Sequence, residues 1–156
     1  MLSGDNRTVQ IVADSSNLYQ LQNNGAIWGY TGTPCPGSTY SGWQMPGNSP
    51  AAVGIAAGNG QLYQLHNGGA IWSYNRAPCN GTSCTGWREI DNNPKAVAIV
   101  AGNKLFKLHN EGVILFYPGT VCSGNTCPPR RISTIIRSPA CCRRQQQSLP
   151  VICRMN

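Results

Sequence analysis

The side chains best suited to chemistry in this chain are aromatic rings that stand beside amide, imidazole and guanidinium groups. An aromatic face can stack on the C–H face of a sugar ring, while polar side chains hydrogen-bond to its hydroxyls. These residues recur at intervals of 44 and 43 residues. We therefore predict a sugar-contacting set that recurs with the repeat: Tyr30 and Tyr74, Trp43 and Trp87, Gln44 and Arg88, His66 and His109, and Asn67 and Asn110.

Groups that could support catalysis are scarce. Glu89 and Asp91 are the only closely spaced carboxylates, and the first repeat has Met45 and Gly47 at the same positions. A histidine that recurs at the repeat spacing is more typical of a role in each unit than of a single catalytic base. The sequence contains no Gly-rich phosphate loop, nucleophile elbow or His-Glu-x-x-His motif. We therefore predict a non-enzymatic protein without a cofactor or a metal.

These residues belong to a sequence repeat. Residues 18–30 recur as 62–74 and again as 105–117. A run of β-branched and small residues precedes each copy, and Gly-Trp follows the first two. Such short runs, separated by turn residues, predict four strands per unit. The first strands are expected at 8–13, 52–57 and 96–101, and Asn-Gly hairpin turns between the second and third strands at Asn23–Gly25, Asn67–Gly69 and Asn110–Gly112.

A four-stranded unit of about 44 residues is typical of a β-propeller blade. An apolar first strand suits the crowded propeller axis, where neighbouring blades cover both faces. The predicted fold is therefore an all-β propeller with blades of four antiparallel strands, and the units span about 8–51, 52–95 and 96–129. About three blades make an incomplete ring, so a homo-oligomer or a longer protein would complete it. Tandem hairpins in a sandwich or solenoid are the alternative.

The repeated block Leu-Tyr-Gln-Leu-His-Asn-x-Gly-x-Ile-Trp-x-Tyr, followed by Gly-Trp and by Glu89–Pro94, resembles the repeats of tectonin and tachylectin-like β-propeller lectins. The likeness covers residues 8 to about 127. It implies sugar pockets between adjacent blades, with N-acetylated hexosamines or other surface sugars as partners and multivalent binding. The expected function is a lectin-like, carbohydrate-binding module. A protein-interaction propeller without a sugar site is the runner-up. Trp28 and Trp72 are interpreted as packing between blades.

Two cysteine pairs occupy the same place in consecutive units, Cys79 with Cys84 and Cys122 with Cys127. Four intervening residues allow a local disulfide, and a zinc site made by both pairs is the alternative. The first unit has Cys35 but Tyr40 in place of its partner. Paired cysteines favour an extracellular location, where Asn80 would be a glycosylation acceptor. The first ten residues lack the apolar region of a secretory signal, so a cytoplasmic location stays open.

The net charge of +7 is concentrated at one end. Residues 1–129 hold six basic residues and all five acids, whereas residues 130–156 hold six arginines and no acid. The body is therefore nearly neutral, and nucleic acid is not an expected partner of the repeats. Binding of anionic surfaces or nucleic acid by the arginine-rich tail is a third interpretation. The longest apolar run has six residues, far below the roughly 20 needed to span a membrane.

The repeat ends near Pro128. Codons that could encode the tail match the repeat motifs better when they are read in other frames. Codons permitted for residues 131–137, read two bases out of step, can spell Asn-Ile-Asp-Asn-Asn-Pro. Codons for residues 148–156, read one base out of step, can spell Leu-Tyr-Gln-Leu-Tyr-Ala-Glu and then a stop. Both stretches fall where the repeat would place these motifs. We hypothesise that residues from about 128 are out-of-frame blade sequence, with a genuine disordered, arginine-rich tail as the alternative. The gene sequence decides between them.

Overall fold

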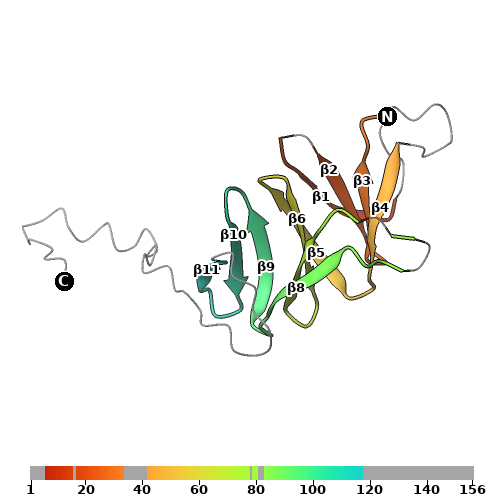
Figure 1. Ribbon diagram of the computed structural model, residues 1–156. Coiled ribbons are helices and arrows are strands. Elements are labelled where there is room, and N and C mark those ends of the chain that lie inside the picture. The colour runs from red at the N-terminus through yellow and green to blue at the C-terminus, as the bar shows by residue number, and fades with distance from the viewer. Residues whose placement is uncertain (1–5, 16, 34–41, 78, 81–82, 118–156) are drawn as a thin grey trace, which may run out of the picture.

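The computed structural model describes residues 6–15, 17–33, 42–77, 79–80 and 83–117 (Figure 1). Every regular element within these residues is a β-strand. No helix in this part of the chain has the length and apolarity needed to cross a membrane. The pair Cys122 and Cys127, the isolated Cys35 and the basic tail at 130–156 lie outside the described residues, so the predictions about them stay predictions.

The strands form three antiparallel sheets, and each sheet follows the order of its strands along the chain. The first sheet consists of β1 (Thr8–Ala13), β2 (Leu18–Gln22), β3 (Ala26–Tyr30) and β4 (Trp43–Asn48). The second consists of β5 (Ala52–Gly58), β6 (Gln61–His66), β7 (Ala70–Tyr74) and β8 (Trp87–Asn92). The third has three described strands, β9 (Ala96–Ala101), β10 (Leu105–His109) and β11 (Ile114–Phe116). The prediction of an all-β fold built from repeated antiparallel units is confirmed.

The repeat in sequence is also a repeat in strand register. Leu21 pairs with Ile27 in the first sheet, and the same two positions pair in the second and third sheets, as Leu65 with Ile71 and Leu108 with Ile114. The Asn-Gly turns between these strands place their last glycine in the left-handed region, with φ of 81°, 82° and 79° at Gly25, Gly69 and Gly112. The predicted hairpin turns are confirmed.

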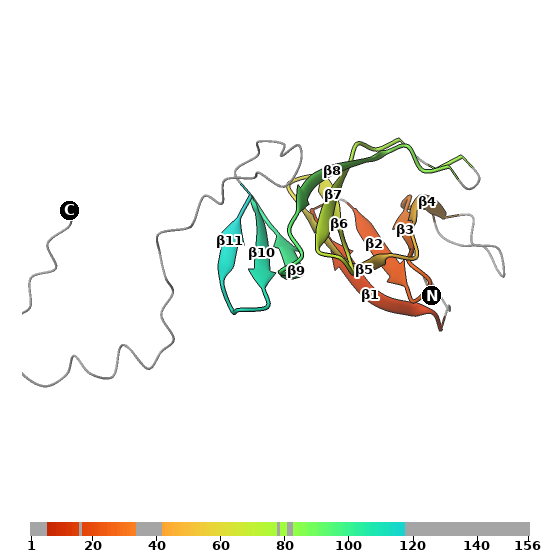
Figure 2. The same cartoon turned by 90° about the horizontal axis from the view of Figure 1, so that it is seen from below.

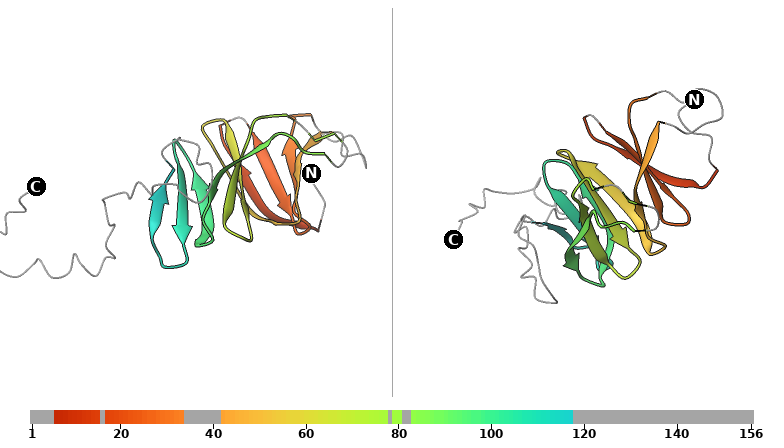
Figure 3. Two further views of the ribbon diagram at one scale, coloured as in Figure 1. Left: turned by 60° about the horizontal axis from the view of Figure 1, so that its bottom comes forward. Right: turned by 45° about the vertical axis from the view of Figure 1, so that its right-hand side comes forward.

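The three sheets lie side by side in chain order, with the second between the other two (Figures 2 and 3). The first strand of each unit contacts the first strand of the next, β1 against β5 and β5 against β9. Side chains alternate across a strand, so each sheet has two faces. We call the face toward the preceding sheet the front face, which in the second sheet carries Ile55 and Leu62. The back face is directed toward the following sheet and carries Leu65 and Ile71 there.

The apolar core lies between the sheets. In the first interface, Leu21 and Ile27 on the back of the first sheet pack against Ile55, Leu62 and Tyr74 on the front of the second. In the second interface, the back of the second sheet meets the front of the third, in a cluster formed by Leu65, Ile71, Ile90, Ala96 and Leu105. Each fully buried Leu or Ile contributes roughly 1.5–3 kcal/mol. The described strands do not close into a ring.

Candidate functional site

A cavity of about 770 Å³ opens between the first and second sheets. It lies at the end where β2 begins and where β3 and β7 finish. Tyrosine rings and polar side chains line it together, and they come from both sheets. The lining includes Asp14, Tyr19, Tyr30 and Gln44 from the first unit, and Tyr74 and Arg76 from the second. Three predicted site residues, Tyr30, Gln44 and Tyr74, are therefore brought to one cavity.

Each tryptophan that follows a Gly-Trp motif packs against one of these tyrosines. The ring centroids of Tyr30 and Trp43 lie 5.4 Å apart, and those of Tyr74 and Trp87 lie 5.0 Å apart. Trp43 is buried and Trp87 packs on the first apolar cluster. Trp43 and Trp87, two of the predicted sugar-contacting residues, therefore do not line this cavity: both rings are used in packing, and the tyrosines form the cavity wall.

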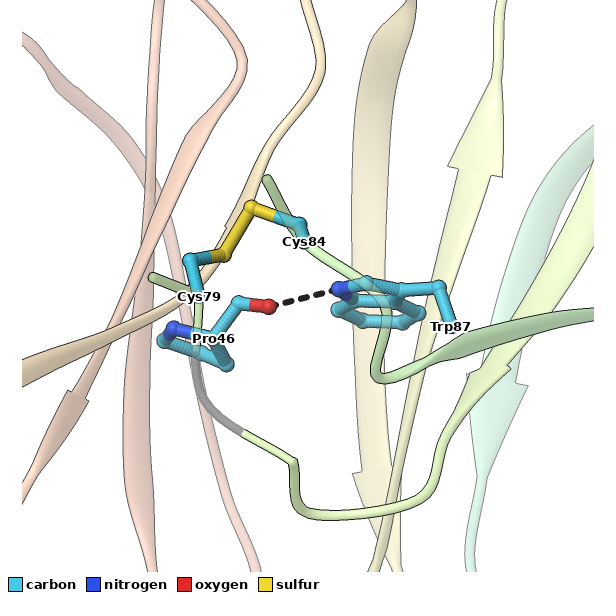
Figure 4. Close-up of a disulfide and its surroundings, with 4 residues drawn as sticks. All are labelled: Pro46, Cys79, Cys84 and Trp87. Atoms are coloured by element: carbon cyan, nitrogen blue, oxygen red, sulfur yellow. Dashed lines mark hydrogen bonds between the residues drawn. A yellow bond between two sulfur atoms is a disulfide. The ribbon is translucent and has the colours of Figure 1, made fainter. Parts of the chain in front are cut away.

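The connection from β7 to β8 fastens the second sheet to β4, the strand that carries Gln44 (Figure 4). The Trp87 indole N–H donates a hydrogen bond to the Pro46 carbonyl over 2.6 Å. The Cys79 amide donates to the Met45 carbonyl over 3.2 Å. Cys79 and Cys84 form a disulfide within this connection, as the cysteine spacing predicts. The cavity wall formed by β4 is thereby held in place from the second sheet.

Glycine at position 29 leaves space for the ring of Tyr19 at the cavity. A Cβ atom at Gly29 would lie 3.0 Å from Cε1 of Tyr19, which is closer than ordinary contact. The second unit has Ser73 at the equivalent position. The missing Cβ atom at Gly29 therefore leaves room for the Tyr19 ring beside the cavity.

Arg76 has an unusual backbone conformation for its residue type. Its φ is 70°, in the left-handed region, and the equivalent residue of the first unit is Gly32 with φ of 85°. A side chain in this region costs on the order of 1–2 kcal/mol, which a glycine avoids. The guanidinium Nη2 donates to the Gly60 carbonyl over 2.7 Å, which fixes the side chain at the rim. The second unit thus has an arginine beside the cavity, at a position where a glycine would avoid the backbone strain.

The hydroxyls of Tyr19 and Tyr74 stay protonated at neutral pH. Burial raises the pKa of Tyr19, the Asp14 carboxylate raises it further, and Arg76 acts in the opposite direction. Burial also raises the pKa of Tyr74, with a contribution from Tyr19. The Asp14 carboxylate accepts hydrogen bonds from the Asn17 backbone over 2.9 Å and from its amide over 2.8 Å, which shapes the β1–β2 turn. The cavity therefore combines hydroxyl groups, a carboxylate and a cation.

The two predicted site histidines lie apart from this cavity. His66 stacks on Trp72 with ring centroids 5.6 Å apart, and His109 is buried on β10. Burial lowers the pKa of both imidazoles. Within the described residues, the Nε2 atoms of both histidines and the indole Nε1 atoms of Trp28 and Trp72 are buried without a hydrogen-bond partner. The His66–Trp72 contact lies within the second unit. The packing between blades expected of Trp28 and Trp72 stays a prediction.

The remaining predicted residues are exposed at other places. Arg88 is exposed on β8, and Asn67 and Asn110 are exposed in the hairpin turns at the far ends of their strands. Asn80 is also exposed, as a glycosylation acceptor requires. None of these four lines the cavity.

Sequence analysis did not identify three residues of the cavity wall. Tyr19 could have been found from the repeat, because an aromatic residue recurs at its position, as Tyr63 and Phe106. Arg76 and Asp14 have no equivalent in the other units, so the repeat gives no sign of them.

Asp91, one of the two closely spaced carboxylates, is paired with a lysine. The Asp91 carboxylate accepts a hydrogen bond from Nζ of Lys107, and both side chains are buried. No group of three or more His, Cys, Asp or Glu side chains within the described ranges could hold a metal ion. In comparisons with protein-family models and with curated proteins, none matches this chain.

Proposed function

We propose that this protein is a non-enzymatic carbohydrate-binding module, that its sheets are blades of a β-propeller, and that a saccharide binds between the first two sheets. The observation that carries the proposal is the cavity in which tyrosines from two sheets stand beside Asp14, Gln44 and Arg76. Its volume of about 770 Å³ lies within the roughly 300–1,000 Å³ of small-molecule sites.

The composition of the cavity suits a sugar better than an apolar ligand. Tyrosine rings offer faces on which the C–H groups of a pyranose can stack. The tyrosine hydroxyls, the Gln44 amide and the Arg76 guanidinium donate hydrogen bonds to hydroxyl or acetamido oxygens, and Asp14 accepts hydrogen bonds from hydroxyl groups. Such a set binds and orients a saccharide without any group placed to cleave it.

The arrangement of the sheets supports the propeller part of the proposal. Each complete unit is a four-stranded antiparallel sheet, and successive first strands are in contact, as they are around a propeller axis. The position of the cavity also agrees with the lectin resemblance, which implies pockets between adjacent blades. N-acetylated hexosamines and other surface sugars are therefore the first ligands to test.

The two interfaces differ at the positions that line the cavity. The second interface has Gly58 in place of Asp14, Ser73 in place of Gly29, and Arg88 in place of Gln44. A Cβ atom at Gly58 would lie 2.6 Å from the Gly102 carbonyl oxygen, so the chain approaches itself closely there. We therefore propose a site in the first interface alone, and multivalent binding would come from several copies of the chain.

A glycan array probed with the folded chain tests the function, followed by calorimetric titration of the strongest binder. Gln44 is exposed, so Gln44→Ala should leave folding intact. Loss of its hydrogen bond, worth about 1 kcal/mol, should weaken binding roughly fivefold. Arg88→Ala is the matched control, because Arg88 is exposed at the equivalent position of the next unit. A folded chain that binds no glycan, or an equal loss in both variants, would contradict the proposal.

A further inference from the structure

The two outer sheets each leave one apolar face uncovered within the described structure. On the front face of the first sheet, Ile11 is 68% exposed, whereas Ile55 at the same position of the second sheet is 1% exposed. On the back face of the third sheet, Ile114 is 51% exposed, whereas Ile27 and Ile71 at the same position are 0% and 1% exposed. Residues that form the core inside the chain are therefore repeated on its two outer faces.

Other apolar residues on the back face of the third sheet are exposed as well. Leu108, the cross-strand partner of Ile114, is 37% exposed, while its equivalents Leu21 and Leu65 are buried. Val100 on β9 is also exposed, and Ala56 at its position in β5 is buried. The third sheet thus presents the apolar set with which the first and second sheets bind their following neighbours.

Not every exposed apolar residue belongs to these faces. Val9, Val53 and Val97 occupy the same position in the three first strands, and all three are exposed. Val53 is 56% exposed although its sheet is covered on both sides. This position therefore lies outside the interface between sheets, and exposed valines there do not mark an uncovered face.

Both interfaces inside the chain join a back face to the next front face. Within the described residues, one front face and one back face have no neighbouring sheet, so they are complementary to each other and not to themselves. Gln20, the cross-strand partner of Ile11 on this front face, stands at the position of Lys107; it is neutral and only 6% exposed, so it introduces no charge there. A contact between the two free faces would repeat an interface that the chain already forms twice. Such a contact is heterologous, and it requires a second molecule.

We propose that the back face of the third sheet binds the front face of the first sheet in a second copy of this chain. The partner is fixed by continuity with the two internal interfaces, which use the same positions. Repetition of this contact adds further copies until the array closes or extends. The association needs no ligand, so it is independent of the proposed sugar site.

Two variants that each block one free face test the proposal. Ile11→Lys places a charge on the free front face, and Ile114→Lys places one on the free back face. Both side chains are mostly exposed, so the variants should fold, which circular dichroism checks. In light scattering and sedimentation velocity, the full chain should have a mass above the monomer that rises with concentration. Each variant alone should be monomeric.

Mixing the two variants gives the sharpest result. The intact back face of Ile11→Lys and the intact front face of Ile114→Lys should form one 1:1 dimer and nothing larger. Val53→Lys is the matched control and should assemble like the unmodified chain. The proposal is overturned if the unmodified chain stays monomeric at all concentrations, if either variant alone still assembles, or if the mixture stays monomeric.

Discussion

The two interfaces between sheets share their apolar residues and differ in the polar groups beside them. In the first, the Gln10 amide donates to the Ile55 carbonyl over 2.9 Å and accepts from the Ile55 N–H over 2.8 Å, while Trp87 donates to Pro46. In the second, Lys107 and Asp91 form a buried ion pair. Positions that repeat thus build the fold, and positions that change give each interface a separate feature: a cavity in one and a buried ion pair in the other.

A single change of residue size illustrates this difference. Gly47 in β4 occupies the position of Asp91 in β8. A Cβ atom at Gly47 would lie 3.1 Å from the Trp87 Nε1 atom, so the missing side chain makes room for the indole. The first interface therefore uses glycine and tryptophan where the second uses the aspartate of its ion pair.

The largest expected effect comes from breaking the buried ion pair. Lys107→Ala leaves Asp91 as a buried, unpaired charge and should lower the free energy of unfolding by about 3–5 kcal/mol. Urea denaturation measures the change. Lys95 and Glu111 form a surface pair whose side chains are about half exposed, so Lys95→Ala should cost less than about 1 kcal/mol. Equal costs in the two variants would mean that burial does not distinguish the pairs.

A smaller effect is expected at the hairpin glycines, which share a backbone conformation but not their surroundings. Gly25 and Gly112 have φ of 81° and 79°. A Cβ atom at Gly25 would lie 1.8 Å from the Ser49 carbonyl oxygen, whereas nothing lies near one at Gly112. Gly112→Ala should lower the free energy of unfolding by about 1 kcal/mol, because an alanine is strained at this positive φ. Gly25→Ala should lower it by about 2–3 kcal/mol, because the backbone must also move. Thermal unfolding of both variants checks this order.

The sequence pattern predicts the strands and turns well because they depend on neighbouring residues. Strands β1 and β9 begin and end at the expected residues, and the Asn-Gly turns adopt positive φ. Contacts between sheets depend on residues far apart in the chain, and the pattern says little about them. Lys107 and Asp91 lie on different sheets, and nothing in the repeat pairs them.

The candidate site was predictable only in part. Tyr30 and Tyr74 recur, so the pattern singles them out, and both line the cavity. Arg76 replaces a glycine of the first unit, so a search for recurrent residues passes over it. Trp43 was predicted to contact a sugar, but its ring packs against Tyr30 and does not line the cavity.

The third prediction concerns a hydrogen bond that is specific to the first interface and should contribute about 1 kcal/mol to the free energy of unfolding. Trp87→Phe keeps an aromatic ring and removes the donor to Pro46. Trp72→Phe removes a similar volume from an indole that lacks a hydrogen-bond partner in the described part of the chain. The stability of Trp87→Phe should therefore be lower than that of Trp72→Phe by about the value of one hydrogen bond. A reversed order in chemical denaturation would count against this role of Trp87.

The smallest effect is a pH dependence that belongs to the second interface. Burial lowers the pKa of His109 in the folded chain, Lys107 lowers it further, and Asp91 opposes the shift. The unfolded chain, with an ordinary histidine pKa of about 6.5, then binds more protons than the folded chain just below that pH. Stability should therefore be full above about pH 6.5 and decline as the pH falls through it.

His109→Gln tests this dependence, because Gln22 occupies the equivalent position of the first unit. The variant should have a flatter stability profile between neutral and mildly acidic pH. Glu111 and Lys95 also act on the imidazole, so both are kept unchanged in the comparison. An unchanged slope in denaturation series at several pH values would show that His109 does not contribute.

The central claim is that the first interface is specialised for a ligand, and Arg76→Gly tests it most directly. Glycine relieves the positive φ at the cost of one exposed hydrogen bond to Gly60, so stability should change by less than about 1 kcal/mol. Calorimetric titration with the strongest glycan from the array should show binding weakened by roughly fivefold or more. Unchanged affinity in this stable variant would contradict the assignment of the cavity as the sugar site.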